Sequence, residues 1–290
     1  MIHAIKKSAA LLTLLAVVAC SNSAANQANT EPKAPAQAET TKIVIGSMGA
    51  DSDIWRFIAK SQAAKDAGVQ IEVKDINDGI TLNKATAEGQ VDVNAFQSWA
   101  YFKTFNKTNG DSLAALSTTY LEPMGLYSKK FQDLKAVPQG ATVAIPNDTA
   151  NTSRALRLLE EAQLLKLKAD FDPVTGTVQD IADNPKKLNI KLVQGASGPR
   201  VLGDVDLAAI GNTNALESGL NVTKDALFHE QVGERVINNI NILATQKDRA
   251  NDAALQKLSA LYHQPAVDAY IKEHFGGTKL DVNQPISSLN

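Results

Sequence analysis

The stretch at 141–159 constrains the fold more than any other part of this sequence. Residues 143–145 read Val-Ala-Ile, a short apolar run typical of a buried strand, and Pro146 ends it. Residues 151–153 read Asn-Thr-Ser, which are favourable N-cap residues, and leucines recur after them at helical spacing. The stretch therefore predicts a strand followed within a few residues by a helix, which is the repeating unit of an α/β sheet.

Arg154 falls in the predicted first turn of that helix. Ligands of open α/β sheets gather beyond the carboxyl ends of strands, and a helix N-terminus there favours an anion. A guanidinium adds a fork of donors that matches a carboxylate. We therefore expect a carboxylate-binding corner at Arg154, whose removal leaves folding intact. The alternative is a solvated arginine near Glu160 and Glu161.

The rest of the chain repeats the alternation of strands and helices. Strands are predicted before and after helices in the first half, which indicates a mostly parallel sheet. The second half contributes further strands and a long extended run, and two amphipathic helices follow it. The predicted strands are 42–48, 69–73, 91–96, 113–121, 188–193, 205–210 and the run 235–245; the predicted helices are 54–68, 82–88, 99–105, 251–262 and 265–275.

One internal echo indicates two related lobes. The segments 89–96 and 203–210 share the pattern Gly-x-Val-Asp-apolar-x-Ala-apolar, and each leads into polar residues at a strand tip. Those polar residues include Gln97 and Ser98 in one lobe and Asn212 in the other. Two lobes whose strand tips face each other form a clamshell that closes around a small ligand.

Composition excludes several classes of function. Lys plus Arg total 29 against 31 Asp plus Glu, which gives no basic excess to favour nucleic acid. The chain has no Gly-x-Ser-x-Gly elbow, no P-loop and no His-Glu-x-x-His motif, and its 4 histidines are scattered. We therefore expect no enzyme, no cofactor and no metal site.

The N-terminus is typical of an exported protein. Lys6 and Lys7 precede an apolar stretch too short to span a bilayer, so residues 1–20 are predicted to be a signal peptide that ends at Cys20. Cys20 is the single cysteine, so no disulfide is expected. Residues 21–41 are rich in Ser, Asn, Ala, Gln, Pro and Glu, which predicts a disordered tether.

Several of these features together resemble one known family. The residues before Cys20 resemble the lipobox of bacterial lipoproteins, in which the cysteine is acylated. The motifs at 95–97, 122–130 and 143–154 resemble those of the NlpA-type methionine-binding lipoproteins, over about 43–277. The resemblance implies the two-lobed periplasmic-binding-protein fold of type II. Lobe 1 is then expected at 43–125 plus 245–290, and lobe 2 at 126–244.

The resemblance also implies a function and a place in the cell. Proteins of this family are substrate-binding components of ABC importers, so an amino acid, with methionine as first choice, and an ABC permease are the expected partners. The chain would be exported and anchored by lipid to a bacterial membrane, on the periplasmic side or at the cell surface. The alternatives are another amino acid, a short peptide, or a surface interaction lipoprotein without a transport role.

The family's site residues map onto this sequence one by one. Arg154 matches the residue that grips the ligand carboxylate, and Asn241 matches an asparagine that hydrogen-bonds the amino acid. Phe96 and Tyr101 match aromatic positions near the ligand side chain. The expected site is completed by polar residues of the strand tips and of the stretch at 141–159, namely Gln97, Ser98, Asn151 and Asn212.

Three positions depart from the family pattern. The family usually has His where this chain has Ser98, often Tyr where it has Asn239, and Asn where it has Gly211. These positions lie at or near the side-chain end of the expected pocket. The resemblance therefore implies a retained carboxylate grip and a changed environment for the ligand side chain, which keeps the alternative ligands open.

Overall fold

The computed structural model describes residues 40–231 and 234–289, with the side chains of 234–236 left aside. The predicted signal peptide and Cys20 lie outside the described residues, as does the predicted tether up to residue 39. Thr41, assigned to the tether from sequence, is already the first residue of a strand. Within the described part of the chain, none of the helices has the length and apolar character needed to cross a membrane.

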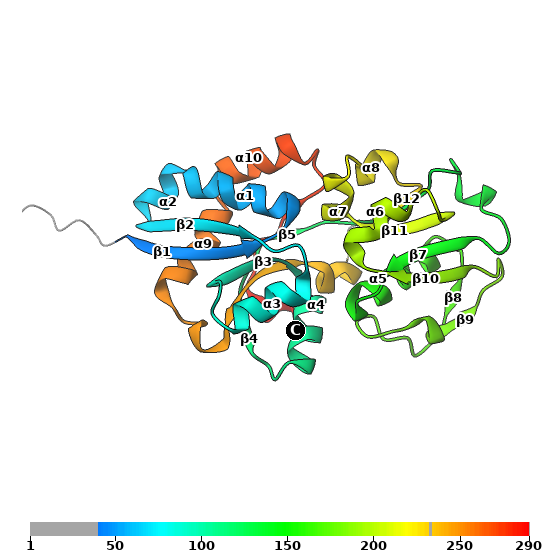
Figure 1. Ribbon diagram of the computed structural model, residues 1–290, viewed down its shortest axis with the longest axis horizontal. Coiled ribbons are helices and arrows are strands. Elements are labelled where there is room, and N and C mark those ends of the chain that lie inside the picture. The colour runs from blue at the N-terminus through cyan, green and yellow to red at the C-terminus, as the bar shows by residue number, and fades with distance from the viewer. Residues whose placement is uncertain (1–39, 232–233, 290) are drawn as a thin grey trace, which may run out of the picture. The chain divides into compact units, whose positions relative to one another are not determined.

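The first lobe is built on a five-stranded sheet in the order β2-β1-β3-β13-β4, drawn in blue, cyan and orange in Figure 1. Strands β1, β2 and β3 are parallel, whereas β13 is antiparallel to both of its neighbours. Strands β1, β2, β3 and β4 therefore run in one direction and β13 runs against them, so the sheet is mixed but mostly parallel, as expected from the sequence. Its strands are β1 (Thr41–Ser47), β2 (Val69–Asp75), β3 (Val93–Ser98), β4 (Leu113–Thr118) and β13 (Asn241–Gln246).

The second lobe repeats this plan with the order β10-β7-β11-β6-β12. Strands β10, β7 and β11 are parallel, and β6 and β12 add antiparallel pairs. The strands are β6 (Met124–Tyr127), β7 (Thr142–Pro146), β10 (Asn189–Val193), β11 (Leu207–Gly211) and β12 (Phe228–His229). Two small pairs complete the strands: β5 (Tyr120–Leu121) with β14 (Leu280–Asp281), and β8 (Lys166–Leu167) with β9 (Ile181–Asp183).

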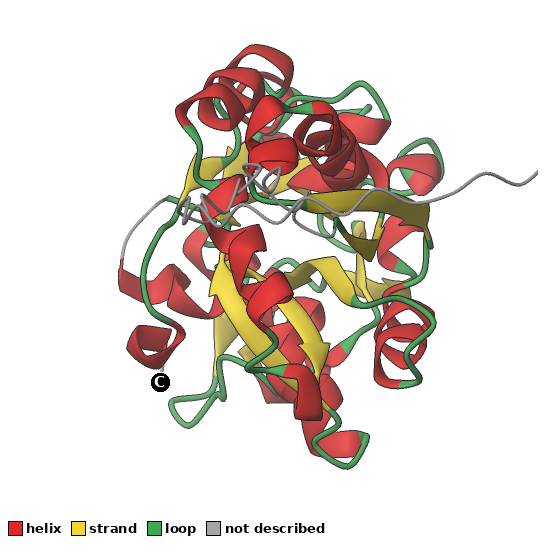
Figure 2. Cartoon of the chain, turned by 90° about the vertical axis from the view of Figure 1, so that its left-hand side faces the viewer, coloured by secondary structure: helices red, strands yellow, loops and turns green. Residues whose placement is uncertain are grey.

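Helices cover both faces of each sheet, as Figure 2 shows for the first lobe. The first lobe holds α1 (Gly49–Lys60), α2 (Gln62–Asp66), α3 (Gly79–Ala87), α4 (Trp99–Thr108), α9 (Ala253–Tyr262) and α10 (Pro265–His274). The second holds α5 (Thr149–Glu161), α6 (Gly198–Val201), α7 (Asn212–Glu217) and α8 (Val222–Asp225). The C-terminal helices thus pack on the N-terminal lobe, so the chain crosses between the lobes and returns.

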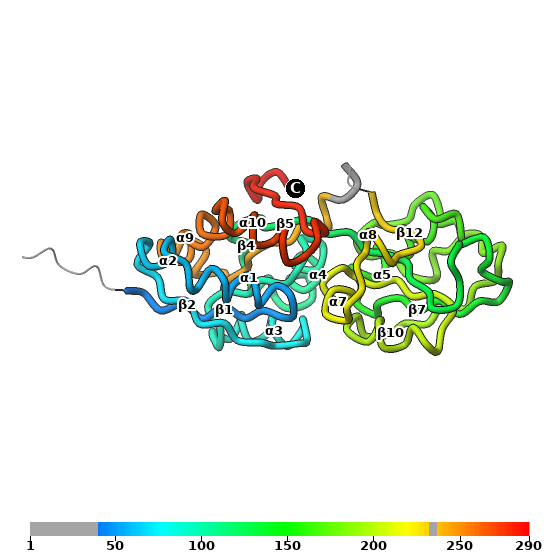
Figure 3. Tube along the Cα trace, turned by 90° about the horizontal axis from the view of Figure 1, so that it is seen from above, coloured from blue at the N-terminus to red at the C-terminus, as the bar shows by residue number. Residues whose placement is uncertain are grey.

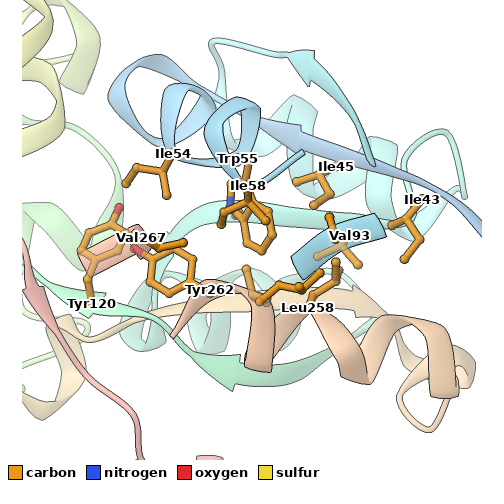
Figure 4. Packing of buried hydrophobic residues seen from close by; sticks show 14 of the residues in the cluster. Ile43, Ile45, Ile54, Trp55, Ile58, Val93, Tyr120, Leu258, Tyr262 and Val267 are labelled. Carbon is orange, nitrogen blue, oxygen red and sulfur yellow. The ribbon is translucent and has the colours of Figure 1, made fainter. Parts of the chain in front are cut away.

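Alternation along β1 explains how one sheet supports two cores. Ile43 and Ile45 point into a cluster with α1, α9 and α10, where Trp55 and Tyr262 are almost fully buried (Figure 4). Val44, between them, contacts the separate cluster under α3. Successive side chains of a strand point to opposite faces, so a continuous apolar run is what a sheet covered on both faces requires.

The repeated Gly-x-Val-Asp segments have the same structural role in both lobes. Asp92 accepts a hydrogen bond from the backbone N–H of Val44 at 2.6 Å, and Asp206 accepts one from that of Thr142 at 2.8 Å. In each case the aspartate's own N–H donates to the carbonyl of the same residue. Each aspartate thereby joins the strand that follows it to the neighbouring parallel strand, which is β1 in the first lobe and β7 in the second, and this accounts for the repeated sequence pattern as a structural repeat.

Two further elements differ from the sequence expectation. Helix α5 begins at Thr149, because Asp148 accepts a hydrogen bond from the N–H of Asn151 and caps the helix. Arg154 therefore lies in the second turn and not the first. Part of the expected extended run at 235–245 is a 3₁₀ helix, η4 (Glu234–Asn239).

The lobe boundary also differs from the expectation. Strand β13 belongs to the first sheet from Asn241 onward, so the return crossing precedes residue 241 and does not fall at 245.

We predict that the two repeated aspartates stabilise their lobes to a similar degree. Asp206→Ala leaves the backbone N–H of Thr142 without its acceptor, which should lower the free energy of unfolding by about 1–3 kcal/mol at pH 7. Asp92→Ala should do the same in the first lobe. Urea denaturation measures both, with the exposed Asp204→Ala as control. Losses below about 0.5 kcal/mol in both variants would contradict the prediction.

Candidate ligand-binding site

A cavity of ≈ 190 Å³ lies where residues of both lobes and of the crossing segments meet. It is smaller than the roughly 300–1,000 Å³ that is usual for drug-sized ligands, and it suits a ligand of amino-acid size. Most of the predicted ligand-binding residues line it. These are Phe96, Gln97, Ser98 and Tyr101 from β3 and α4, Asn151 and Arg154 from α5, and Asn241 from β13.

Arg154 is held in the cavity wall by a carboxylate of the protein itself. Its Nε donates to Glu230 Oε1 at 2.8 Å and its Nη2 to Glu230 Oε2 at 2.5 Å. Nη2 also donates to the backbone carbonyl of Glu122 at 2.7 Å. Burial alone would lower the pKa of Arg154, but the charge and hydrogen bonds of Glu230 outweigh burial and raise the pKa.

This arrangement corrects the geometry expected for the carboxylate corner. The edge of the guanidinium that could hold a ligand bidentately through Nε and Nη2 is occupied by Glu230. Nη1 has no hydrogen-bond partner among the described residues, and Arg154 lines the cavity. A ligand carboxylate would therefore meet Arg154 through the two N–H groups of Nη1.

A β-bulge places Phe96 and Gln97. On β13, Ile242 pairs with Gln97 whereas the next residue pairs with Ala95, so Phe96 is an extra residue in β3. Gln97 consequently turns inward, and its amide donates to Asn94 at 2.7 Å and to Asn83 at 2.8 Å in a buried network. Phe96 lines the cavity, and the centre of its ring lies 5.7 Å from that of the Tyr101 ring in an edge-to-face contact.

The other predicted polar residues at the cavity already have partners within the protein. Ser98 caps α4 by accepting a hydrogen bond from the N–H of Tyr101 at 3.2 Å. The Asn151 amide donates to Asp148 at 3.0 Å. The Asn241 amide is best satisfied with its Nδ2 toward the carbonyls of Phe96 and Gln97, both at 3.3 Å, so it holds the bulge.

Asn212 does not line the cavity. It is fully buried at the start of α7, where its Nδ2 donates to Glu122 Oε2 and to Thr278 Oγ1, both at 3.0 Å. Its neighbour Thr213 does line the cavity, together with Glu122. Sequence placed Asn212 at a strand tip correctly, but the first helical residue after the tip turns behind the cavity wall.

A buried group of charges that the sequence did not indicate lies directly behind the site. Lys279, with a side chain 0% exposed, donates to Asp51 at 2.9 Å and to Glu122 Oε2 at 2.6 Å. It lies 3.9 Å from the centre of the Tyr120 ring, whose hydroxyl donates to Asp51 at 2.7 Å. Figure 3 shows the red C-terminal segment that carries Lys279 beside β5. Asp51, which belongs to the first turn of α1, is part of this cluster.

Closure of the cavity involves a contact between the lobes. Gln194, which follows β10, donates to Asp78 at 3.5 Å, and Asp78 caps α3 in the other lobe. Both residues line the cavity. Among the described residues there is no group of three His, Cys, Asp or Glu placed to hold a metal ion. The cavity is thus a polar site with one arginine and an aromatic wall.

The fold and the site together define a class of protein. Two α/β lobes that are joined by crossing segments and enclose a small polar cavity form a substrate-binding protein of the periplasmic type.

The comparisons with known proteins identify the family within this class. A family model described as NlpA lipoprotein matches residues 43–283, and the chain belongs to this family. It is 34% identical over 267 residues to the probable D-methionine-binding lipoprotein MetQ of Haemophilus influenzae, which covers 91% of this chain and 96% of that protein.

Solved structures of substrate-binding proteins have a similar fold. A nutrient-binding protein from Burkholderia cenocepacia bound to methionine has a TM-score of 0.78 at 37% identity and covers 83% of this chain and 99% of its own. The substrate-binding protein of a methionine transporter from Streptococcus pneumoniae has a TM-score of 0.76 at 34% identity, covering 83% and 95%.

We predict that Arg154 contributes to stability as well as to the site, contrary to the expectation from sequence. Arg154→Ala leaves Glu230, whose side chain is 11% exposed, without its charged partner, which should lower the free energy of unfolding by about 3–5 kcal/mol. The double variant Arg154→Met, Glu230→Gln should recover much of this loss. Urea denaturation at pH 7 measures both.

The control is the exposed ion pair of Lys130 with Asp206, where Lys130→Ala should cost less than about 1 kcal/mol. A loss in Arg154→Ala no larger than that of the control would show that Glu230 does not depend on Arg154.

Proposed function

We propose that this protein is a lipid-anchored solute-binding protein that captures an amino acid, with methionine as first choice, and delivers it to an ABC permease. The observation that carries the proposal is Arg154 in the cavity wall, which Glu230 and the Glu122 carbonyl hold while its Nη1 has no partner among the described residues. A buried guanidinium fixed in this way suits the carboxylate that all free amino acids share. Phe96 and Tyr101 supply an apolar wall for a side chain.

The family relationship supports the ligand class. Relatives at 33–37% identity bear names or titles that refer to D-methionine or methionine binding. The assigned roles of Arg154, Asn151, Phe96, Tyr101 and Asn241 as ligand contacts belong to this proposal. So does the non-enzymatic character of the chain, which its membership in a family with substrate-binding members supports.

A second candidate ligand is favoured by one observation. A Cβ built on Gly211 meets no atom within 4 Å, although Gly211 lines the cavity. The family often has Asn at this position, so the cavity is open where relatives carry a side chain. A bulkier amino acid or a short peptide with a free carboxylate would use this space.

The ligand class is tested by thermal shift with free amino acids, their amides and dipeptides, on protein stripped of bound ligand. A ligand at about 100 times its dissociation constant should stabilise the folded state by roughly 2.7 kcal/mol, or raise Tm by roughly 5–10 °C. We expect methionine to do this and methioninamide, which lacks the carboxylate, to do so far less. A screen in which nothing raises Tm would refute the proposal and favour a surface lipoprotein without a transport role.

The anchor is tested by cell fractionation. Cys20 lies outside the described residues, and its setting at the end of the predicted signal peptide supports acylation there. We expect the wild type to fractionate with membranes, and Cys20→Ala to accumulate as an uncleaved or soluble form. Ser21→Ala serves as the control for a neighbouring change. The lipid anchor would be ruled out by identical fractionation of the wild type and Cys20→Ala.

A further inference from the structure

We propose that Glu122, together with Thr213, binds the ammonium group of the ligand. This inference rests on the proposed function and extends it, because it assigns the second charged group of an amino acid to a named residue. Neither the sequence motifs nor the departures from the family pattern singled out Glu122 as a ligand contact. The hydrogen bonds of the Glu122 carboxylate at the cavity wall indicate this role.

Glu122 lies in the crossing segment between β5 and β6 and lines the cavity, with its side chain 10% exposed. Its two carboxylate oxygens differ in their partners. Oε2 accepts hydrogen bonds from Lys279 at 2.6 Å and from Asn212 at 3.0 Å, and the Thr213 hydroxyl, which is shared between the two oxygens, lies 3.2 Å from it. Among the described residues, Oε1 is reached by the Thr213 hydroxyl alone, at 3.1 Å. Because a carboxylate offers about four lone-pair sites, Oε1 retains capacity for another donor.

Glu122 is held in its charged form. Burial alone would raise the pKa of Glu122, but the Lys279 charge and the hydrogen bonds of Lys279 and Asn212 outweigh burial and lower the pKa. Lys279 donates to Asp51 as well as to Glu122. One lysine thus serves two carboxylates, and Arg154 is already paired with Glu230. An ammonium group at Oε1 would give Glu122 a second cationic partner besides Lys279.

The position of Glu122 relative to Arg154 fits the polar end of an amino acid. Arg154 Nη2 donates to the backbone carbonyl of Glu122 at 2.7 Å, so the guanidinium and the Glu122 side chain belong to adjoining parts of the wall. An amino acid carries its carboxylate and ammonium on the same carbon atom and can reach two such neighbouring groups. The ligand side chain would then extend toward Phe96 and Tyr101.

Two other carboxylates of the cavity wall are poorer candidates. Asp78 accepts hydrogen bonds from the N–H and hydroxyl of Thr81, and Asp148 accepts from the N–H and amide of Asn151. Both are helix caps whose oxygens already have local donors. They remain the natural competitors for an ammonium group, so the experiment includes them.

The test compares methionine with 4-(methylsulfanyl)butanoic acid, which lacks the amino group, by calorimetric titration. We expect the wild type to prefer methionine by about 30-fold or more, because binding without the ammonium leaves a desolvated Glu122 oxygen unpaired. In Glu122→Gln the preference should shrink to within about threefold. Loss of a merely structural residue would weaken both ligands alike and leave the preference unchanged.

Further variants test which carboxylate of the cavity wall binds the ammonium group of the ligand. Asp78→Asn and Asp148→Asn should each keep the preference, as should the control Glu217→Gln, which alters an exposed carboxylate elsewhere. The inference is overturned if the wild type binds both compounds equally, if Glu122→Gln keeps the full preference, or if Asp78→Asn or Asp148→Asn abolishes it. If no amino acid binds the wild type, the proposed function fails, and this inference with it.

Folding of Glu122→Gln is checked by circular dichroism, because Glu122 is a partner of Lys279. If that variant does not fold, a crystal structure of the wild type with methionine decides the question without substitutions. A ligand nitrogen within about 3.2 Å of Glu122 Oε1 supports the inference. A ligand nitrogen bonded to Asp78 or Asp148 and away from Glu122 overturns it.

Discussion

The buried ammonium of Lys279 is the interaction on which the arrangement of this protein depends. It joins the C-terminal segment to α1 through Asp51, to the crossing segment through Glu122 and to α7 through Thr213. Such a charge is stable in the interior because every donor has an oxygen partner and the Tyr120 ring lies against it. The two lobes and their connection therefore meet at one ammonium group, each of whose donors has an oxygen partner.

The side chains of the cavity wall are held in place by hydrogen bonds that begin at Lys279. Lys279 fixes Glu122, and the Glu122 carbonyl in turn accepts a hydrogen bond from Arg154, which Glu230 holds from the other side. The arginine is thus oriented before any ligand arrives, and little conformational entropy remains to be lost when a ligand binds. A site ordered in this way suits the small zwitterionic solute proposed for it.

Local sequence signals predicted much of the fold and part of the site. The apolar run at 143–145 and the leucine stripe after it define β7 and α5 by periodicity alone, and the echo at Asp92 and Asp206 marks equivalent joints. The antiparallel strands and the ionic centre were not predictable in this way. Glu122 and Lys279 are 157 positions apart and Arg154 and Glu230 are 76 apart, and no periodic pattern links such residues.

The bulge at Phe96 has a consequence for how binding preferences can change over evolution. The bulge shifts the alternation of β3 by one position. As a result, the Gln97 side chain bonds to the buried amides and the Phe96 side chain lines the cavity. Gln97 also lines the cavity, but its amide is held by Asn83 and Asn94, whereas the apolar ring of Phe96 lies against the cavity and Tyr101. Substitutions at residue 96 can alter which solutes fit while the amide network, and with it the folded lobe, stays as it is.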